Sequence, residues 1–247
     1  MPFIELQSVD STNNYARQQI HAGLAQHGMA FFAHEQVAGK GQRGKVWVAE
    51  KDANIFLSLV VNPYPLGLAE QFQLSACVAV AVQDFFLKYA GDDTKIKWPN
   101  DLYWQDRKAG GILIENIVTG EPQNSTGKKW TSIIGIGINI NQINFDPELK
   151  NPVSLKQITG KNFNTVELAK ELCAILNKHF TLLIEEGFEE IFTAYLHHLY
   201  KRKAKVKLKR GNKVFEVMIE EVSPTGKLIT HHGIQQEFDF GEVEWII

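Results

Sequence analysis

The chain has 247 residues, of which 26 are basic and 28 acidic, and 44% are hydrophobic. This length suits one large domain, or a catalytic domain of about 200 residues with a small appendage. The balanced charge gives no overall indication of a nucleic-acid or membrane surface. The first residues, MPFIELQSVDSTNNYA, lack the basic and apolar regions of a signal peptide, and no apolar run reaches the roughly 18 residues of a membrane span. We therefore expect a soluble, cytoplasmic protein.

The segment DSTNNYA, from Asp10 to Ala16, has the composition of a helix start. Asp10 or Ser11 is the expected N-cap. Small hydrogen-bonding side chains at a helix N-terminus can also hold a polar ligand. Capping and ligand binding are compatible here, and the pattern leaves both open.

Glycines alternate with basic residues in HEQVAGKGQRGKVW, from His34 to Trp47. Glycines let backbone N–H groups turn toward an anion, while the cations neutralise phosphate or carboxylate oxygens. The segment is neither a Walker sequence nor a dinucleotide-binding fingerprint. The pattern indicates a phosphate-binding loop, although a flexible, solvated loop fits the residues equally well.

Hydrophobic periodicity predicts three helices and several short strands. The helices are expected at residues 71–89, 166–184 and 188–199, the second opened by Asn164 with Glu167 three residues later. Cys77 and Cys173 lie alone in the apolar faces of these helices, which predicts buried thiols rather than a disulfide or a zinc site. Strands are expected at residues 31–34, 55–61, 95–98, 112–115, 130–140 and 205–208. The mixture has no regular βαβ rhythm, and it predicts the α/β (α+β) class with a mixed sheet.

A second chemical motif is KWPNDLYWQDRKAGGILIEN, from Lys97 to Asn116. Pro99 bends the chain after a strand, so Asn100 and Asp101 should project at its end. Asp101 could take a proton from an amine or hold Mg²⁺, or it could simply be a turn residue. Lys108 stands one residue before the glycine pair Gly110 and Gly111, where its ammonium could reach a carboxylate close to bare backbone.

The strand IIGIGINI, from Ile133 to Ile140, alternates isoleucine with glycine. The isoleucine face is expected to be core. The opposite face carries Gly135, Gly137 and Asn139, and glycines in a strand usually mean that something approaches the backbone closely. A neighbouring helix and a flat ligand such as adenine are equally compatible with this face, with Asn139 as a polar contact.

Composition changes after Tyr200, where KRKAKVKLKRGNK is dense in lysine and arginine. Lysines alternate with Ala204, Val206 and Leu208, which is typical of a strand with one solvated face rather than a nucleic-acid-binding patch. Turns at Gly211 and Pro224 and further short strands predict a small barrel over residues 201–247. A unit this small should pack against the main domain, residues 1–200.

In this order and spacing, the motifs resemble the biotin protein ligase family. The resemblance runs from about Val9 to the carboxyl terminus and rests on the loop ending in Trp47, on KWPND with DRKAGGI, and on GIGIN. It implies a catalytic domain related to class II aminoacyl-tRNA synthetases and lipoate ligases, followed by an SH3-like barrel. It also implies activation of biotin with ATP and transfer to a lysine of a biotin carboxyl carrier protein. A homodimer is compatible with it.

The resemblance assigns a role to each matching residue. Biotin would be held by Ser11, Thr12, Asn13, Gln36, Lys40, Gly41, Gln42, Lys108 and Gly111. ATP would be held by Lys40, Arg43, Lys45, Trp47, Asn100 and Asn139. Lys40 and Lys108 would stabilise the attack of the biotin carboxylate on the α-phosphate, with Mg²⁺ bridging the phosphates and no ligand assigned to the metal. Asp101 would receive the carrier lysine and take its proton, because the amine must be neutral to attack.

The loop departs from the common family form. Relatives usually have GRGRxGR, whereas this chain has GKGQRGK. Lys40 keeps a charge but lacks the bidentate fork of arginine. Gln42 replaces a cation, so we expect a functional enzyme that retains the adenylate less firmly.

Two alternative functions remain at the level of sequence. One is a lipoate or octanoyl ligase on the same scaffold, although KWPND favours biotin. The other is a non-catalytic, biotin-responsive regulator. The motifs begin at Asp10, which leaves no expected helix-turn-helix before them and argues against DNA binding of that type.

Overall fold

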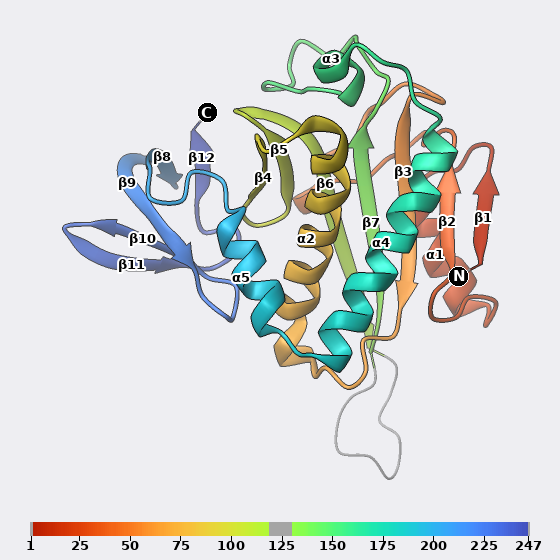
Figure 1. Ribbon diagram of the computed structural model, residues 1–247, viewed down its shortest axis with the longest axis horizontal. Coiled ribbons are helices and arrows are strands. Elements are labelled where there is room, and N and C mark those ends of the chain that lie inside the picture. The colour runs from red at the N-terminus through yellow and green to blue at the C-terminus, as the bar shows by residue number, and fades with distance from the viewer. Residues whose placement is uncertain (1, 119–129, 247) are drawn as a thin grey trace.

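A computed structural model describes residues 2–118 and 130–246. Its main element is a mixed seven-stranded sheet in the order β1-β2-β3-β7-β6-β5-β4 (Figure 1). β1 runs parallel to β2, and the other neighbours are antiparallel. The strands are β1 (Phe3–Leu6), β2 (Ala30–Ala33), β3 (Asn54–Val61), β4 (Thr94–Lys97), β5 (Asp101–Trp104), β6 (Arg107–Val118) and β7 (Trp130–Asn139). The mixed sheet with flanking helices confirms the predicted fold class.

Three helices, α2, α4 and α5, cover one face of this sheet (Figure 1). Asn164 caps α4 as predicted, since its side chain accepts hydrogen bonds from the backbone N–H groups of Val166 and Glu167. The helices are α1 (Thr12–His21), α2 (Gln71–Ala90), α3 (Leu155–Thr159), α4 (Thr165–Glu185) and α5 (Glu189–His197), with short 3-10 turns η1 (Gln42–Gly44) and η2 (Leu68–Glu70). Among the described residues, no helix is both long and apolar enough to cross a membrane.

Strand alternation gives the sheet two different faces. On β7, Ile134, Ile136 and Ile138 join the main core beneath α2 and α4, as the isoleucine pattern predicted. Ile133, of the opposite parity, packs with Ala16 of α1 in a smaller cluster. We call these the helix-layer face and the site face. The glycines of β7 therefore lie on the site face, next to α1.

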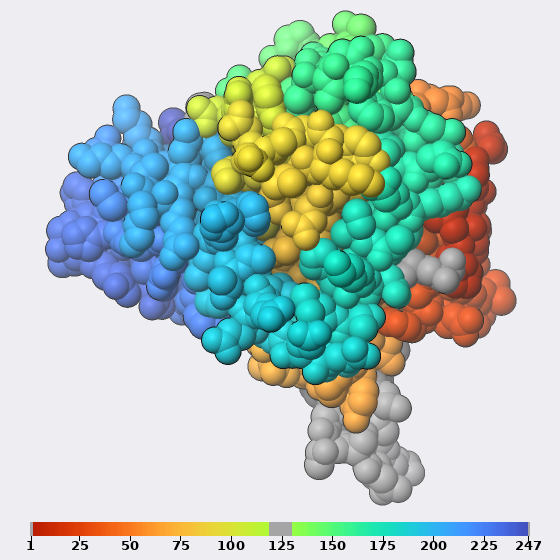
Figure 2. All heavy atoms as spheres, viewed as in Figure 1, coloured from red at the N-terminus to blue at the C-terminus, as the bar shows by residue number. Residues whose placement is uncertain are grey.

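A second, antiparallel sheet occupies the C-terminal part in the order β11-β10-β9-β8-β12, which is compatible with the SH3-like expectation. Its strands are β8 (Lys205–Arg210), β9 (Lys213–Val222), β10 (Leu228–His232), β11 (Ile234–Phe238) and β12 (Glu244–Ile246). It packs on the rest of the molecule (Figure 2). Its buried residues are continuous with the main core. The Trp98 indole N–H donates to the Gly226 carbonyl across this contact, at 2.9 Å.

The basic segment forms the alternating strand that the sequence predicted. Leu208 of β8 is buried, while Lys205 and Lys207 are exposed. Acidic residues, mainly of β9, pair with the basic residues in and around β8: Lys203 with Glu220, Lys205 with Glu216, Arg202 with Glu221 and Arg210 with Glu242. Much of the charge is therefore neutralised within the sheet itself.

Both cysteines are buried, as predicted. Burial raises the pKa of the Cys77 thiol and that of the Cys173 thiol to about 12, so both stay protonated.

Strands β1 and β5 were not predicted. Each has four residues, and the alternation in β5 is interrupted by tyrosine and tryptophan with polar edges.

Candidate functional site

A pocket of about 580 Å³ opens on the site face, within the usual size range for small-molecule sites. Its walls come from the loop around η1, the β4–β5 turn, strands β6 and β7, and the C-terminal sheet. Every residue to which the sequence assigned a role lines it: Ser11, Thr12, Asn13, Gln36, Lys40, Gly41, Gln42, Arg43, Lys45, Trp47, Asn100, Asp101, Lys108, Gly111 and Asn139. Segments separated by up to about 130 positions in the sequence therefore meet in one cavity.

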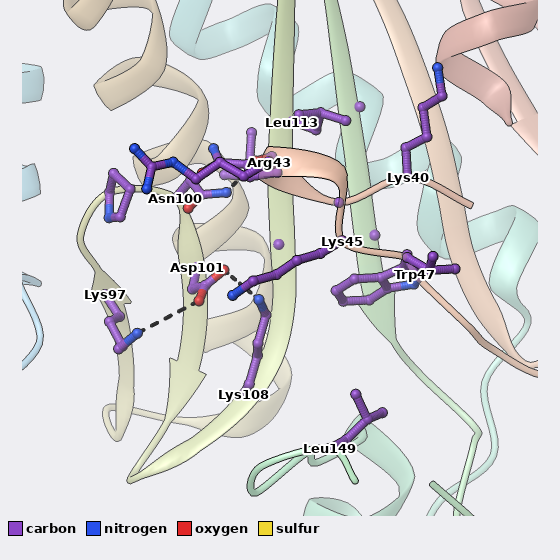
Figure 3. Close-up of a pocket in the computed structure, with 18 of the residues that line it drawn as sticks. Lys40, Arg43, Lys45, Trp47, Lys97, Asn100, Asp101, Lys108, Leu113 and Leu149 are labelled. Carbon is purple, nitrogen blue, oxygen red and sulfur yellow. Dashed lines mark hydrogen bonds and ion pairs between the residues drawn. The ribbon is translucent and has the colours of Figure 1, made fainter. Parts of the chain in front are cut away.

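Three lysines converge on one aspartate in the floor of the pocket. Lys108 Nζ donates to Asp101 Oδ1 at 2.6 Å, and Lys97 Nζ lies 3.8 Å from Asp101 Oδ2. From the loop, the side chain of Lys45 reaches toward Asp101 and Lys108 (Figure 3). One carboxylate cannot neutralise three ammonium groups, so this centre carries a net positive charge and attracts anions. Asp101 follows Pro99 at the start of β5, as the motif predicted.

The start of α1 contributes a network of polar side chains. Gln36 Oε1 accepts hydrogen bonds from the backbone N–H of Thr12 at 2.8 Å and from its hydroxyl at 3.1 Å. Asn13 Nδ2 donates to Glu115 Oε2 at 2.8 Å, and the Ser58 hydroxyl lies 2.6 Å from Asn13 Oδ1. Ser11 is the N-cap by backbone geometry, but its side chain makes no cap hydrogen bond. This network fixes the orientation of the donors and acceptors at the start of α1.

The glycine face of β7 receives side chains of the site. A Cβ at Gly137 would lie 3.0 Å from Trp47 Cε2, and one at Gly111 would lie 3.4 Å from Trp47 Cζ3. The Trp47 indole thus lies flat against bare backbone. Its Nε1 is buried without a hydrogen-bond partner among the described residues. At Gly135 the neighbour is Asn13 of α1, so the helix explanation holds at one glycine and a planar ring occupies the other.

Two predicted ATP contacts use their amides within the protein. Asn100 Nδ2 donates to the Ile112 carbonyl at 2.6 Å, which ties the β4–β5 turn to β6. Asn139 Nδ2 donates to the carbonyls of Val153 and Lys108, at 3.1 and 3.4 Å. Both side chains brace the strands around Lys108, and their contacts with ATP stay predictions.

The two remaining cations of the loop point away from Asp101 and Lys108 (Figure 3). Lys40 Nζ donates to Asn14 Oδ1 at 2.5 Å. Arg43 Nη1 donates to the Gly241 carbonyl at 2.8 Å, and the guanidinium lies 5.2 Å from the centre of the Phe240 ring. The structure brings Lys45, but not Lys40 or Arg43, to the cationic centre. The assignment of Lys40 to the reacting carboxylate stays a prediction.

The loop itself is a short, closed hairpin. The Gly41 N–H donates to the Lys45 carbonyl at 2.7 Å, and the Trp47 N–H to the Gly39 carbonyl at 2.9 Å. Gly39 has no room for a Cβ beside the Trp47 carbonyl oxygen. Gln42 is half-buried at the pocket wall.

Four site residues were not identified from the sequence: Ser58, Lys97, Glu115 and Trp245. Ser58 is fully buried within the apolar strand β3, and a buried polar residue in such a strand needs a partner. Lys97 and Glu115 lie inside the motif at residues 97–116, but nothing in its spacing distinguishes them from their neighbours. Trp245 reaches the pocket only because the C-terminal sheet folds back against β4.

We expect Gly135→Ala to disturb both stability and ligand binding. The new Cβ would collide with the Asn13 side-chain amide, displacing it from Ser58 and Glu115. Overpacking of this kind costs about 1–3 kcal/mol of unfolding free energy. Denaturant unfolding measures the loss, and calorimetric titration with biotin should show weaker binding. Gly67→Ala is the control, because its Cβ meets only Glu70 Oε2, at 3.5 Å; equal behaviour of the two variants would contradict the expectation.

Comparisons with known proteins agree on one family. A model of the biotin/lipoate A/B protein ligase family matches residues 5–139. The bifunctional ligase/repressor BirA of Escherichia coli is 34% identical over 181 residues, 72% of this chain and 53% of that protein. The biotin–acetyl-CoA-carboxylase ligase of Paracoccus denitrificans is 29% identical over 91% of this chain and 92% of that protein.

Solved structures agree with these matches. The biotin protein ligase from Aquifex aeolicus in complex with biotin and ATP has a TM-score of 0.81 and 25% identity, covering 99% of this chain and 98% of that one. The present chain spans about half the length of the BirA relatives. Residues 5–139 are more than half of the 247 residues. The chain therefore belongs to the biotin/lipoate A/B protein ligase family.

Proposed function

We propose that the protein is a biotin protein ligase, which forms biotinyl-AMP from biotin and ATP and transfers biotin to a lysine of a biotin carboxyl carrier protein. The observation that carries the proposal is the cationic centre at Lys108 beside the polar network of Thr12 and Asn13. The first suits a carboxylate meeting a phosphate, and the second suits an uncharged, hydrogen-bonding head group. The similarity to the Aquifex aeolicus ligase with biotin and ATP supports the same assignment.

In the first step, a biotin carboxylate oxygen attacks the α-phosphorus of ATP, and the bond to the bridging oxygen breaks, with its electron pair, to release pyrophosphate. Both reactants are anions, so repulsion is the main barrier that the protein can lower. Lys108 donates to the reacting oxygens, and Lys45 adds charge from the loop. Lys40 would turn from Asn14 toward the ligand when the site fills.

In the second step, the carrier lysine attacks the acyl carbon of the mixed anhydride. Its ammonium, with an ordinary pKa of about 10.4, first passes a proton to Asp101 or through it to solvent. The carbon–nitrogen bond then forms, and the carbon–oxygen bond breaks with its electron pair going to AMP. The amine loses its second proton to the departing phosphate or to water. Asp101 is suited to this role because it is an oriented carboxylate at the pocket floor.

Mg²⁺ is proposed to enter with ATP, held by phosphate oxygens and water as is usual for this ion. Among residues 2–118 and 130–246, no group of three His, Cys, Asp or Glu side chains could hold a metal ion. Asp101 is already paired with two lysines, which disfavours its binding Mg²⁺. The described residues of the pocket therefore do not fit a preformed metal site.

We also propose a cytoplasmic location and, as the assembly, a homodimer. The dimer is supported by the edge of β6: beyond Ile112 this strand pairs with β7 but has no partner on its other side among the described residues. Sedimentation velocity with and without biotin and ATP tests this. The charge pairing of β8 with β9 favours the expectation that nucleic acid is not a partner.

The function is tested by incubating the protein with labelled biotin, ATP, Mg²⁺ and a carrier domain. We expect label on the carrier only when ATP is present, and none on a carrier whose acceptor lysine is changed to arginine. Excess unlabelled biotin should abolish labelling, whereas lipoate and octanoate should not. Effective competition by lipoate or octanoate would replace the proposal with the lipoate or octanoyl ligase alternative.

Gln42→Arg is expected to retain biotinyl-AMP more firmly than the wild type does. A guanidinium at this half-buried position would add a charge-assisted hydrogen bond to the adenylate, enough for a release about tenfold slower. Release is measured without carrier, by filtering the enzyme from labelled biotinyl-AMP over time. Gln26→Arg, on an exposed turn, is the control. Equal release from wild type and Gln42→Arg would show that Gln42 does not weaken retention.

A further inference from the structure

Lys97 is a buried lysine that has no role in the two reaction steps proposed above. It is the last residue of β4, and its side chain is only 10% exposed. Lysine is almost never buried unless it is paired. Its ammonium faces the pocket floor rather than solvent (Figure 3). Burying an ammonium group costs free energy, so the position of Lys97 indicates a role in the site.

The ammonium of Lys97 lies between one carboxylate and two aromatic rings. Asp101 Oδ2 is 3.8 Å away. The Tyr103 ring centre, on β5, is 5.0 Å away, and the Trp245 ring centre, on β12, is 5.2 Å away. Aromatic faces attract a cation that has lost its water. The C-terminal sheet thus contributes Trp245 to the surroundings of the Lys97 ammonium.

The surrounding charges work partly against this cation. Burial, with the charges of Lys108 on β6 and Lys45 in the loop, lowers the pKa of Lys97 to about 8, although Asp101 acts to raise it. The Tyr103 hydroxyl remains neutral, because burial and the neighbouring Asp101 raise its pKa. Asp101 is therefore the group that keeps Lys97 charged at neutral pH, and the two depend on each other.

The two oxygens of Asp101 have different partners. Oδ1 accepts the short hydrogen bond from Lys108, and Oδ2 faces Lys97. In the proposed reaction Lys108 turns to the reacting oxygens of the substrate, which frees Oδ1. A carboxylate held at one oxygen cannot rotate away when the other changes partner. The acceptor lysine could then take the place of Lys108 at Oδ1.

We propose that Lys97 is a positioning residue for the transfer step: seated on Tyr103 and Trp245, it holds Asp101 by Oδ2 and presents Oδ1 to the carrier lysine. This inference rests on the proposed ligase function. It assigns Lys97 no contact with biotin or ATP. Loss of its charge should therefore slow transfer much more than formation of biotinyl-AMP, which loses only one of the positive charges at the pocket floor.

The test compares Lys97→Met and Lys97→Arg with the wild type in two separate reactions. Biotin-dependent exchange of pyrophosphate into ATP reports the first step. Single-turnover transfer from added biotinyl-AMP to a carrier domain reports the second. Lys97→Met keeps most of the apolar stem and removes the charge. Lys95→Met is the matched control, because Lys95 lies on the same face of β4 but outside the pocket.

At pH 7 we expect Lys97→Met to slow transfer by about tenfold or more. An opposite charge within about 4–6 Å of a carboxylate typically changes its proton equilibrium by at least this factor. Exchange should fall much less than transfer, and Lys97→Arg should recover most of the transfer. Because Lys97 loses its proton as pH rises through about 8, the wild type should approach Lys97→Met between pH 7 and 9. Over the same pH range the transfer rate of Lys97→Arg should rise relative to that of the wild type, because arginine keeps its charge.

Two results would overturn the inference while leaving the ligase function intact. One is transfer by Lys97→Met equal to that of Lys95→Met. The other is an equal loss of exchange and transfer at every pH, which would indicate a purely structural role. A wild type without any exchange would instead refute the ligase function itself. Thermal unfolding of each variant verifies that the folded protein is being compared.

Discussion

Lys108→Ala is expected to slow formation of biotinyl-AMP by about 10²- to 10³-fold, the usual effect of removing a donor that stabilises developing charge. Lys108 Nζ is held at the pocket floor by Asp101, at 2.6 Å, and its backbone is fixed by hydrogen bonds with residues 151 and 153. Among the three lysines at the pocket floor, Lys108 makes the shortest contact with Asp101. Biotin-dependent pyrophosphate exchange measures the effect.

The control for Lys108→Ala is Lys161→Ala, which removes an exposed lysine that does not line the pocket. Lys108→Arg should retain part of the activity, because it keeps the charge but places a planar group where a compact ammonium stood. Exchange by Lys108→Ala at the rate of the Lys161→Ala control would remove Lys108 from the catalytic machinery.

Asp101→Asn is expected to slow the transfer step, whereas Lys108→Ala slows formation of biotinyl-AMP. The amide keeps the shape of the side chain but cannot take a proton, so transfer should fall by about 10²- to 10⁴-fold, the typical contribution of general acid–base catalysis. Formation of biotinyl-AMP should change much less, and the intermediate should accumulate even with carrier present. Rapid-quench measurement of biotinyl-AMP and labelled carrier follows both species.

Asp92→Asn, an exposed aspartate before β4, serves as the control for Asp101→Asn. The asparagine also removes the ion pairs of Lys97 and Lys108, so an unfolding curve should accompany the kinetics. If Asp101→Asn transferred biotin as fast as this control, the carrier lysine would lose its proton by another route, and the positioning role of Lys97 would fall with it.

Much of the fold could be predicted because local patterns and packing agree. The isoleucine alternation of β7 forms the helix-layer core, and the apolar stripe of α4 begins at the predicted cap Asn164. Short strands were harder. In β5 the aromatic residues Tyr103 and Trp104 break the alternation, because both faces of that strand meet other parts of the protein. Such contacts are long-range and leave no periodic signal.

The site was predictable as a set of residues but not as a geometry. All the assigned residues line one pocket, yet Lys40 and Arg43 bond to Asn14 and Gly241 instead of the cationic centre. Ser58 and Trp245 enter the site through tertiary packing alone. The glycines at positions 135 and 137 indicated a close approach to the backbone, but only the fold identifies Asn13 and Trp47 as the approaching groups.

The central claim is tested most directly by following one labelled biotin through both steps in a single reaction. The protein is mixed with labelled biotin, ATP and Mg²⁺ without carrier, and the carrier domain is added later. We predict that labelled biotinyl-AMP forms first and that the label then moves to the acceptor lysine as AMP is released. Labelled carrier formed without a biotinyl-AMP intermediate, or no adenylate from biotin at all, would contradict the assignment as a biotin protein ligase.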